Sequence, residues 1–255
     1  MLRSLAAHPQ IKVVHQIAEP DTPEDFALFK RLRRHTLEEI DATDRHARHR
    51  ALVAGDILVL KNAVWIHPAP WRGFILARNP FAVIASALFV RAPGGGIRAK
   101  TNPAGLAKHA DQVRRWARGI DPEVREQLES LDLISAFALL YARKMVHHHK
   151  TGQPIVRYEE FVVDPEPWLR RILRHLRLEW DDSVMRAHEA YPEGTHGHGG
   201  IALWKPIHAG SLDRYRGLPD ETFDRIHTLT APALDCLGYS VKDREVSLNA
   251  IDHRF

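Results

Sequence analysis

Short apolar runs alternate with helical patterns along this chain, and their order predicts the fold class. Strands are predicted at 11–15, 57–60, 74–77 and 155–158, and the continuous apolar run 57–60 suits a strand buried on both faces of a sheet. Apolar residues at helical spacing predict helices at 1–8, 24–40, 104–118, 122–149, 167–176 and 219–236, with a further helix beginning at Pro80. Strands that alternate with helices favour a mainly parallel sheet covered on both faces. We therefore expect an α/β three-layer sandwich in one domain, residues 1–255.

The segment 74–88 carries the clearest chemical signal. Its apolar residues end at Arg78, a turn dipeptide follows, and Pro80 suits the first turn of a helix. Ligands of open parallel sheets bind at the carboxyl ends of strands, where Arg78 would stand. Ser86 follows Arg78 by eight residues, about two helical turns into the predicted helix. A guanidinium, a hydroxyl and free helix-start N–H groups suit a phosphate, and the alternative is a strand-ending arginine beside a solvent-facing serine.

This segment resembles the 3′-phosphate-binding segment of sulfotransferases that use 3′-phosphoadenosine 5′-phosphosulfate (PAPS). A second resemblance lies at 156–165, which is similar to that family's Tyr-Glu-Asp-Leu segment and its trailing Asp-Pro. The resemblance implies a P-loop NTPase-like fold in which Arg78 and Ser86 hold the 3′-phosphate and Tyr158 lies near the adenine. A tyrosine that caps the core with its hydroxyl bonded to backbone is the alternative for Tyr158.

A looser resemblance covers 208–216, which is similar to the loop that closes over the nucleotide in these enzymes. It implies that Gly210 and Ser211 contact a phosphate, because glycine lets backbone N–H groups approach closely. The basic residues that some members place before the glycine are replaced here by His208 and Ala209.

The family resemblance also implies catalytic residues. Lys61 follows the run 57–60 and matches a lysine that neutralises charge in the transition state. The general base stays open between His15 and Glu19. The implied reaction moves a sulfuryl group from PAPS to a hydroxyl or amine of a small-molecule or carbohydrate acceptor. The alternatives are a non-catalytic nucleotide-binding relative and, ranked low, a small-molecule kinase, since Mg²⁺-coordinating residues are not evident.

Composition and charge limit the ligands and the cellular location that we expect. A net charge of +4 and a pI near 9.3 favour an anionic ligand but are too mild for nucleic acid. No apolar window is long enough to span a bilayer. A single cysteine, Cys236, excludes an internal disulfide and favours a cytoplasmic location, while a homodimer stays open. No metal site is expected: the triplet 147–149 ends a predicted helix, where imidazolium suits the helix dipole.

The start of the sequence lacks one family feature. Sulfotransferases carry, ahead of the helix that matches residues 1–8, a strand and a loop of the type Pro-Arg-Ser-Gly-Thr-Thr that cradles the 5′-phosphosulfate. Either the start lies too late or this relative has lost the loop. We expect an in-frame upstream extension of about 10 to 20 codons that encodes the strand and the loop.

Overall fold

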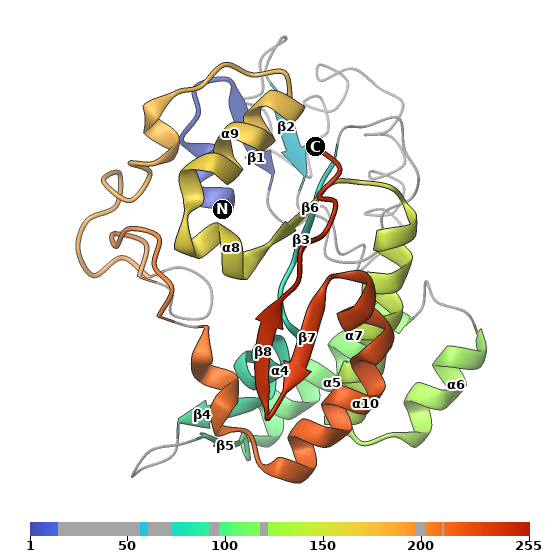
Figure 1. The fold of residues 1–255 in the computed structure, drawn as a ribbon. Helices are drawn as coiled ribbons and strands as arrows, with labels where there is room; N and C mark the ends of the chain where they lie inside the picture. Colours follow the sequence, from blue (N-terminus) through green and yellow to red (C-terminus); the bar gives the residue numbers. More distant parts are fainter. Residues whose placement is uncertain (15–56, 61–72, 92–96, 118–121, 197–201, 211) are drawn as a thin grey trace, which may run out of the picture. The chain divides into compact units, whose positions relative to one another are not determined.

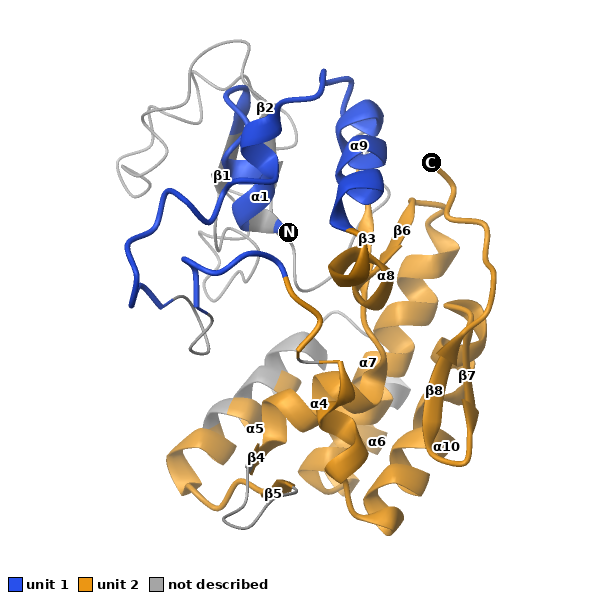
Figure 2. Cartoon of the chain, turned by 60° about the vertical axis from the view of Figure 1, so that its left-hand side comes forward, with its two compact units in different colours: residues 1–71, 165–207 blue, residues 72–164, 208–255 orange. Residues whose placement is uncertain are grey.

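The computed structural model describes residues 1–14, 57–60, 73–91, 97–117, 122–196, 202–210 and 212–255 (Figure 1). The chain divides into two compact units, each with its own buried residues (Figure 2). Unit 1 comprises Met1–Trp71 with Pro165–Ile207, and unit 2 comprises Arg72–Asp164 with His208–Phe255. The single domain 1–255 stays a prediction. The predicted helix 24–40 lies outside the described residues.

The described residues of unit 1 include a pair of parallel strands and several helices. These elements are α1 (Leu2–Ala6), β1 (Ile11–Val14), β2 (Ile57–Leu60), α9 (Pro165–His175) and the 3₁₀ helix η2 (Asp182–Val184). Strand β1 pairs with β2 in parallel, with Ile11 opposite Ile57. The Ser183 hydroxyl donates to the carbonyl of Ala7 over 2.8 Å, which joins η2 to the end of α1. The predicted first helix and both predicted strands are confirmed.

Unit 2 is built on a second parallel pair. Strand β3 (Ile75–Ala77) lies beside β6 (Ile155–Arg157), with Ala77 opposite Arg157. Each strand leads directly into a helix, α4 (Pro80–Leu88) after β3 and α8 (Tyr158–Val163) after β6. Tyr158 therefore begins a helix, and the prediction that it ends the strand is wrong by one residue. The parallel pairing of these strands is confirmed.

Three helices of unit 2 pack against α4: α5 (Pro103–Ala117), α7 (Leu133–Lys150) and α10 (Asp220–Cys236). A further helix, α6 (Pro122–Ser130), packs against α5 and α7. Helix α10 runs along α7, and the Phe81 ring of α4 stacks on Phe223 of α10 with centroids 4.1 Å apart. The predicted single helix 122–149 is wrong, because it breaks before α7. Asp132 is the N-cap of α7, and its side chain accepts from the N–H of Ile134 and Ser135 at 3.0 and 3.2 Å.

Two antiparallel hairpins in unit 2 were not predicted. Strand β4 (Phe89–Arg91) pairs with β5 (Ile97–Ala99), and β7 (Tyr239–Lys242) pairs with β8 (Glu245–Leu248). The β7–β8 turn places Asp243 and Arg244 at φ of 49° and 63°, although the sequence there has no glycine to signal such a turn. The fold is mixed α/β, and the three-layer sandwich stays a prediction.

The His148 side chain contradicts one expectation for the end of α7. It is only 4% exposed, and burial, then the charges of Lys144 and His147, lower its pKa to about 3. It is therefore neutral in the folded chain at neutral pH. The explanation of the triplet 147–149 by imidazolium at a helix end does not hold for His148.

A buried neutral histidine makes the fold sensitive to acid. The unfolded chain takes up a proton at His148 below about pH 6.5, whereas the folded chain does so only near pH 3, so the free energy of unfolding falls as the pH drops between these values. Urea denaturation measures the free energy of unfolding at pH 7.5 and at pH 5. The fall between these two values is expected to be about 2 kcal/mol smaller in His148→Gln than in the parent chain. The control is His147→Gln, which replaces an exposed neighbour. An unchanged acid loss in His148→Gln would contradict the assignment.

Candidate functional site

The structure describes four of the predicted site residues, and all four belong to unit 2. These are Arg78, Ser86, Tyr158 and Gly210. The remaining predicted residues lie outside the described residues: His15, Glu19, Lys61 and Ser211. Their roles stay predictions.

Arg78 and Tyr158 lie together at the carboxyl ends of β3 and β6. Because Ala77 is opposite Arg157 in the parallel register, the next residue of each strand emerges at the same edge. The Arg78 guanidinium carbon lies over the Tyr158 ring, 4.5 Å from its centroid. Both side chains are partly buried. A cation over an aromatic face is an attractive contact. Two segments far apart in the sequence therefore meet at one edge of the strand pair, through the side chains of Arg78 and Tyr158.

The backbone beside Arg78 is held by two buried side chains. The Tyr141 hydroxyl of α7 donates to the carbonyl of Arg78. The N–H of Asn79 donates to Glu159 Oε1 over 2.9 Å. These contacts fix the turn that presents the arginine.

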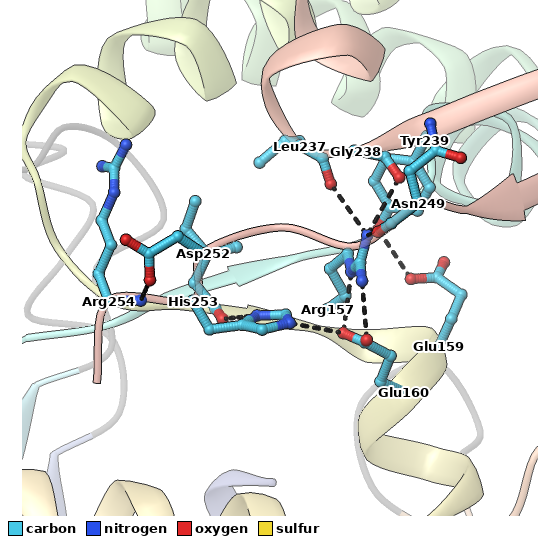
Figure 3. Close-up of polar contacts among 11 residues, drawn as sticks. Arg157, Glu159, Glu160, Leu237, Gly238, Tyr239, Asn249, Asp252, His253 and Arg254 are labelled. Carbon is cyan, nitrogen blue, oxygen red and sulfur yellow. Dashed lines mark hydrogen bonds and ion pairs between the residues drawn. The ribbon is translucent and has the colours of Figure 1, made fainter.

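Glu159 is almost fully buried and links three elements. Its Oε1 also accepts from Asn79 Nδ2 at 3.0 Å, and its Oε2 accepts from the Tyr239 hydroxyl of β7 at 2.8 Å (Figure 3). Burial, and then the Glu159 carboxylate, raise the pKa of both Tyr141 and Tyr239 well above the ordinary range. Both phenols therefore keep their protons and act as donors.

The N-terminus of α4 differs from the expectation of free N–H groups. Asn79 caps the helix: its Oδ1 accepts from the N–H of Ala82 at 2.7 Å, and its carbonyl accepts from the N–H of Val83 at 3.2 Å. Pro80 has no N–H to offer. The helix start is thus largely satisfied by its own cap. A phosphate bound here would depend on side chains, and Ser86 is exposed on α4.

Gly210 lies in a tight turn that leads back to α4. Its N–H donates to His208 Nδ1 over 3.2 Å, so this donor is used within the turn. Beyond it, the 3₁₀ helix η4 (Asp213–Gly217) is anchored on α4: Arg214 Nη2 donates to the carbonyl of Phe89 at 3.0 Å, and the buried Tyr215 ring lies 6.0 Å from that of Phe81. The nucleotide contact of Gly210 stays a prediction.

Arg157, the residue before Tyr158, forms a second polar cluster (Figure 3). The side chain is 2% exposed, and its Nη1 donates to the carbonyls of Leu237, Gly238 and Asn249 at 3.4, 3.0 and 2.7 Å. Its Nε and Nη2 donate to the two oxygens of Glu160 at 2.8 and 2.7 Å. Arg157 therefore joins the start of α8 to the end of α10 and to the chain after β8.

The described ranges contain neither a candidate metal centre nor a candidate membrane-spanning helix. Among those residues, no group of three or more His, Cys, Asp or Glu side chains is placed to hold a metal ion. The helices that the structure describes include none with the length and apolar character needed to cross a membrane.

Sequence reasoning missed four residues that build the site. Asn79, Tyr141, Glu159 and Tyr239 shape the turn at Arg78. The Asn-Pro pair at the helix start is a recognisable capping signal. The other three have no local signal, because their partners lie far away in the sequence.

Comparisons with known proteins bear on this site. No family model matches the sequence. Protein-tyrosine sulfotransferase 1 of Danio rerio is 26% identical over 144 residues, which are 52% of this chain and 34% of that protein. Protein-tyrosine sulfotransferase of Drosophila melanogaster is 29% identical over 92 residues, which are 33% of this chain and 18% of that protein. The chain matches about a third or less of the length of these curated relatives. These similarities support the predicted relationship of the chain to the sulfotransferase family.

Proposed function

We propose that this chain binds PAPS and takes part in the transfer of its sulfuryl group to a hydroxyl or amine of an acceptor. One observation carries the proposal. The two segments that resemble sulfotransferase nucleotide-binding segments meet at one edge of the β3–β6 pair, where the Arg78 guanidinium lies 4.5 Å from the Tyr158 ring centroid. Similarity to protein-tyrosine sulfotransferases supports the same reaction class.

In the proposed complex, Arg78 and Ser86 bind the 3′-phosphate. A guanidinium directs its N–H groups outward in its own plane, which suits a phosphate at its edge. Tyr158 lies near the adenine and supplies an aromatic surface. Gly210 and Ser211 close over the nucleotide.

In the proposed reaction, an acceptor oxygen or nitrogen forms a bond to sulfur as the bond from sulfur to the 5′-phosphate oxygen breaks. Adenosine 3′,5′-bisphosphate leaves. Lys61 neutralises charge in the transition state, and His15 or Glu19 takes the acceptor's proton. The names of the relatives add protein tyrosine to the small-molecule and carbohydrate hydroxyls proposed as acceptors. The cytoplasmic location and the homodimer stay predictions.

Calorimetry and a transfer assay test this function. Titration with adenosine 3′,5′-bisphosphate is expected to show one binding site per chain, and mass spectrometry is expected to detect sulfated acceptor in a panel of phenols, sugars and tyrosine peptides incubated with PAPS. No binding of the bisphosphate would overturn the proposal. Binding without transfer to any acceptor would favour the non-catalytic nucleotide-binding relative.

A further inference from the structure

We infer that Glu159 is a positioning residue that gives the site its selectivity for a 3′-phosphate, by fixing the turn that presents Arg78. This inference rests on the proposed function. It concerns a residue that does not itself meet the nucleotide, since its carboxylate is buried and both of its oxygens already accept hydrogen bonds from protein groups.

The first step is the peptide unit between Arg78 and Asn79. Its carbonyl accepts from the Tyr141 hydroxyl, and its N–H donates to Glu159 Oε1 at 2.9 Å. A planar peptide held at both polar ends cannot rotate without losing one of these bonds. The direction in which the Arg78 side chain leaves the turn is therefore fixed from two sides.

The second step connects this turn to α4. Asn79 Nδ2 donates to the same Glu159 oxygen at 3.0 Å, while Asn79 Oδ1 caps α4 through the N–H of Ala82 at 2.7 Å. Ser86 lies on that helix. Glu159 thus fixes the turn that carries Arg78 relative to the helix that carries Ser86. Binding one phosphate by both side chains requires this spacing to be constant.

The third step is the support of Glu159 itself. The Tyr239 hydroxyl of β7 donates to Oε2 at 2.8 Å (Figure 3), so the carboxylate oxygen that does not accept from Asn79 is held as well. Tyr158, the proposed adenine contact, is the preceding residue of α8. One buried carboxylate therefore lies beside the proposed phosphate and adenine contacts.

A purely structural role would have a different signature. A buried carboxylate that only stabilised the fold would affect every ligand of the site alike. A residue that acts through Arg78 affects only ligands that carry a 3′-phosphate. Adenosine 5′-phosphate, which has the adenine but no 3′-phosphate, separates the two roles.

The test compares the dissociation constants of adenosine 3′,5′-bisphosphate and adenosine 5′-phosphate by calorimetry. Glu159→Ala is expected to lower the affinity for the bisphosphate about five- to tenfold and to change the affinity for the monophosphate less than about twofold. Glu159→Gln keeps an acceptor oxygen for Asn79 and is expected to stay within about threefold of the parent for the bisphosphate. In a chain that already carries Arg78→Ala, Glu159→Ala is expected to lower the affinity for the bisphosphate by less than a further factor of about two.

The matched control is Thr230→Val. It removes a buried hydroxyl of unit 2 that donates to the Ile226 carbonyl at 2.7 Å, and it is expected to leave both affinities unchanged. Circular dichroism monitors folding of every variant. Tyr239→Phe carries the test if Glu159→Ala does not fold, because it keeps the buried ring and removes only the bond to Oε2; we expect a bisphosphate-specific loss of about threefold.

These measurements distinguish failure of the proposed function from failure of the role assigned to Glu159. If the parent chain does not bind the bisphosphate, the proposed function fails. If the parent binds it and Arg78→Ala weakens it, the proposed site stands and the inference alone is tested. An unchanged bisphosphate affinity in folded Glu159→Ala, or an equal loss for both nucleotides, would then overturn the role of Glu159, and an unchanged bisphosphate affinity in Tyr239→Phe would do the same.

Discussion

Replacing Arg157 with leucine is expected to lower the free energy of unfolding by roughly 3 to 5 kcal/mol, because it removes a buried guanidinium from an ion pair with the partly exposed Glu160 and from three backbone carbonyls. The loss includes more than the pair with Glu160. The carbonyls of Leu237, Gly238 and Asn249 also lose their donor, Arg157 Nη1. Unsatisfied buried acceptors are costly because no water replaces the lost bond.

Urea denaturation measures this loss of unfolding free energy, and two further variants test its cause. Arg157→Lys keeps the charge but not the planar fork that reaches Glu160 with two bonds, so an intermediate loss is expected. Arg216→Leu removes an exposed arginine paired with exposed Asp213 and is expected to leave the free energy of unfolding nearly unchanged. A loss below about 1 kcal/mol in Arg157→Leu would show that the cluster does not stabilise the fold.

Arg78→Ala is expected to weaken binding of adenosine 3′,5′-bisphosphate at least about tenfold. The physical reason is the loss of charge-assisted hydrogen bonds to a dianionic phosphate, which contribute roughly 1.5 to 3 kcal/mol each. Calorimetry measures the change. Arg78→Lys keeps a point charge without the bidentate geometry and is expected to bind with intermediate affinity.

The control for Arg78 is Arg98→Ala, which removes an exposed arginine of β5 in the same unit. It separates a specific phosphate contact from a general effect of positive charge, and it is expected to leave the affinity unchanged. If Arg78→Ala bound the bisphosphate as tightly as the parent, the assignment of Arg78 as the phosphate contact would be wrong. The resemblance of 74–88 to the sulfotransferase segment would then be a coincidence of strand and helix pattern.

The parts of the fold that the sequence predicts well are those with strong local signals. The apolar runs that became β2 and β3 are continuous and are followed by Lys61 and Arg78, and the Asn-Pro pair marks the start of α4. The break before α7 was missed because apolar spacing continues past Asp132, whose side chain nevertheless caps a new helix. The hairpins were missed because their strands, such as β4 and β7, mix apolar and polar residues and lack a continuous apolar run like that of β2.

The residues that support the candidate site could not be predicted from local sequence signals. Glu159 sits in a Tyr-Glu-Glu sequence that suggests two solvated charges at a helix start. Its burial depends on Asn79 and Tyr239, each of which lies 80 residues away in the chain. Such long-range hydrogen bonds leave no pattern in a single sequence. The family resemblance pointed to Arg78 and Tyr158, but only the register of β3 and β6 brings them together.

A crystal structure with adenosine 3′,5′-bisphosphate tests the central claim most directly. The account predicts the 3′-phosphate within hydrogen-bond distance of the Arg78 guanidinium and the Ser86 hydroxyl, with the adenine beside the Tyr158 ring. A nucleotide bound elsewhere on the chain, or bound here with its 3′-phosphate away from Arg78, would contradict the claim.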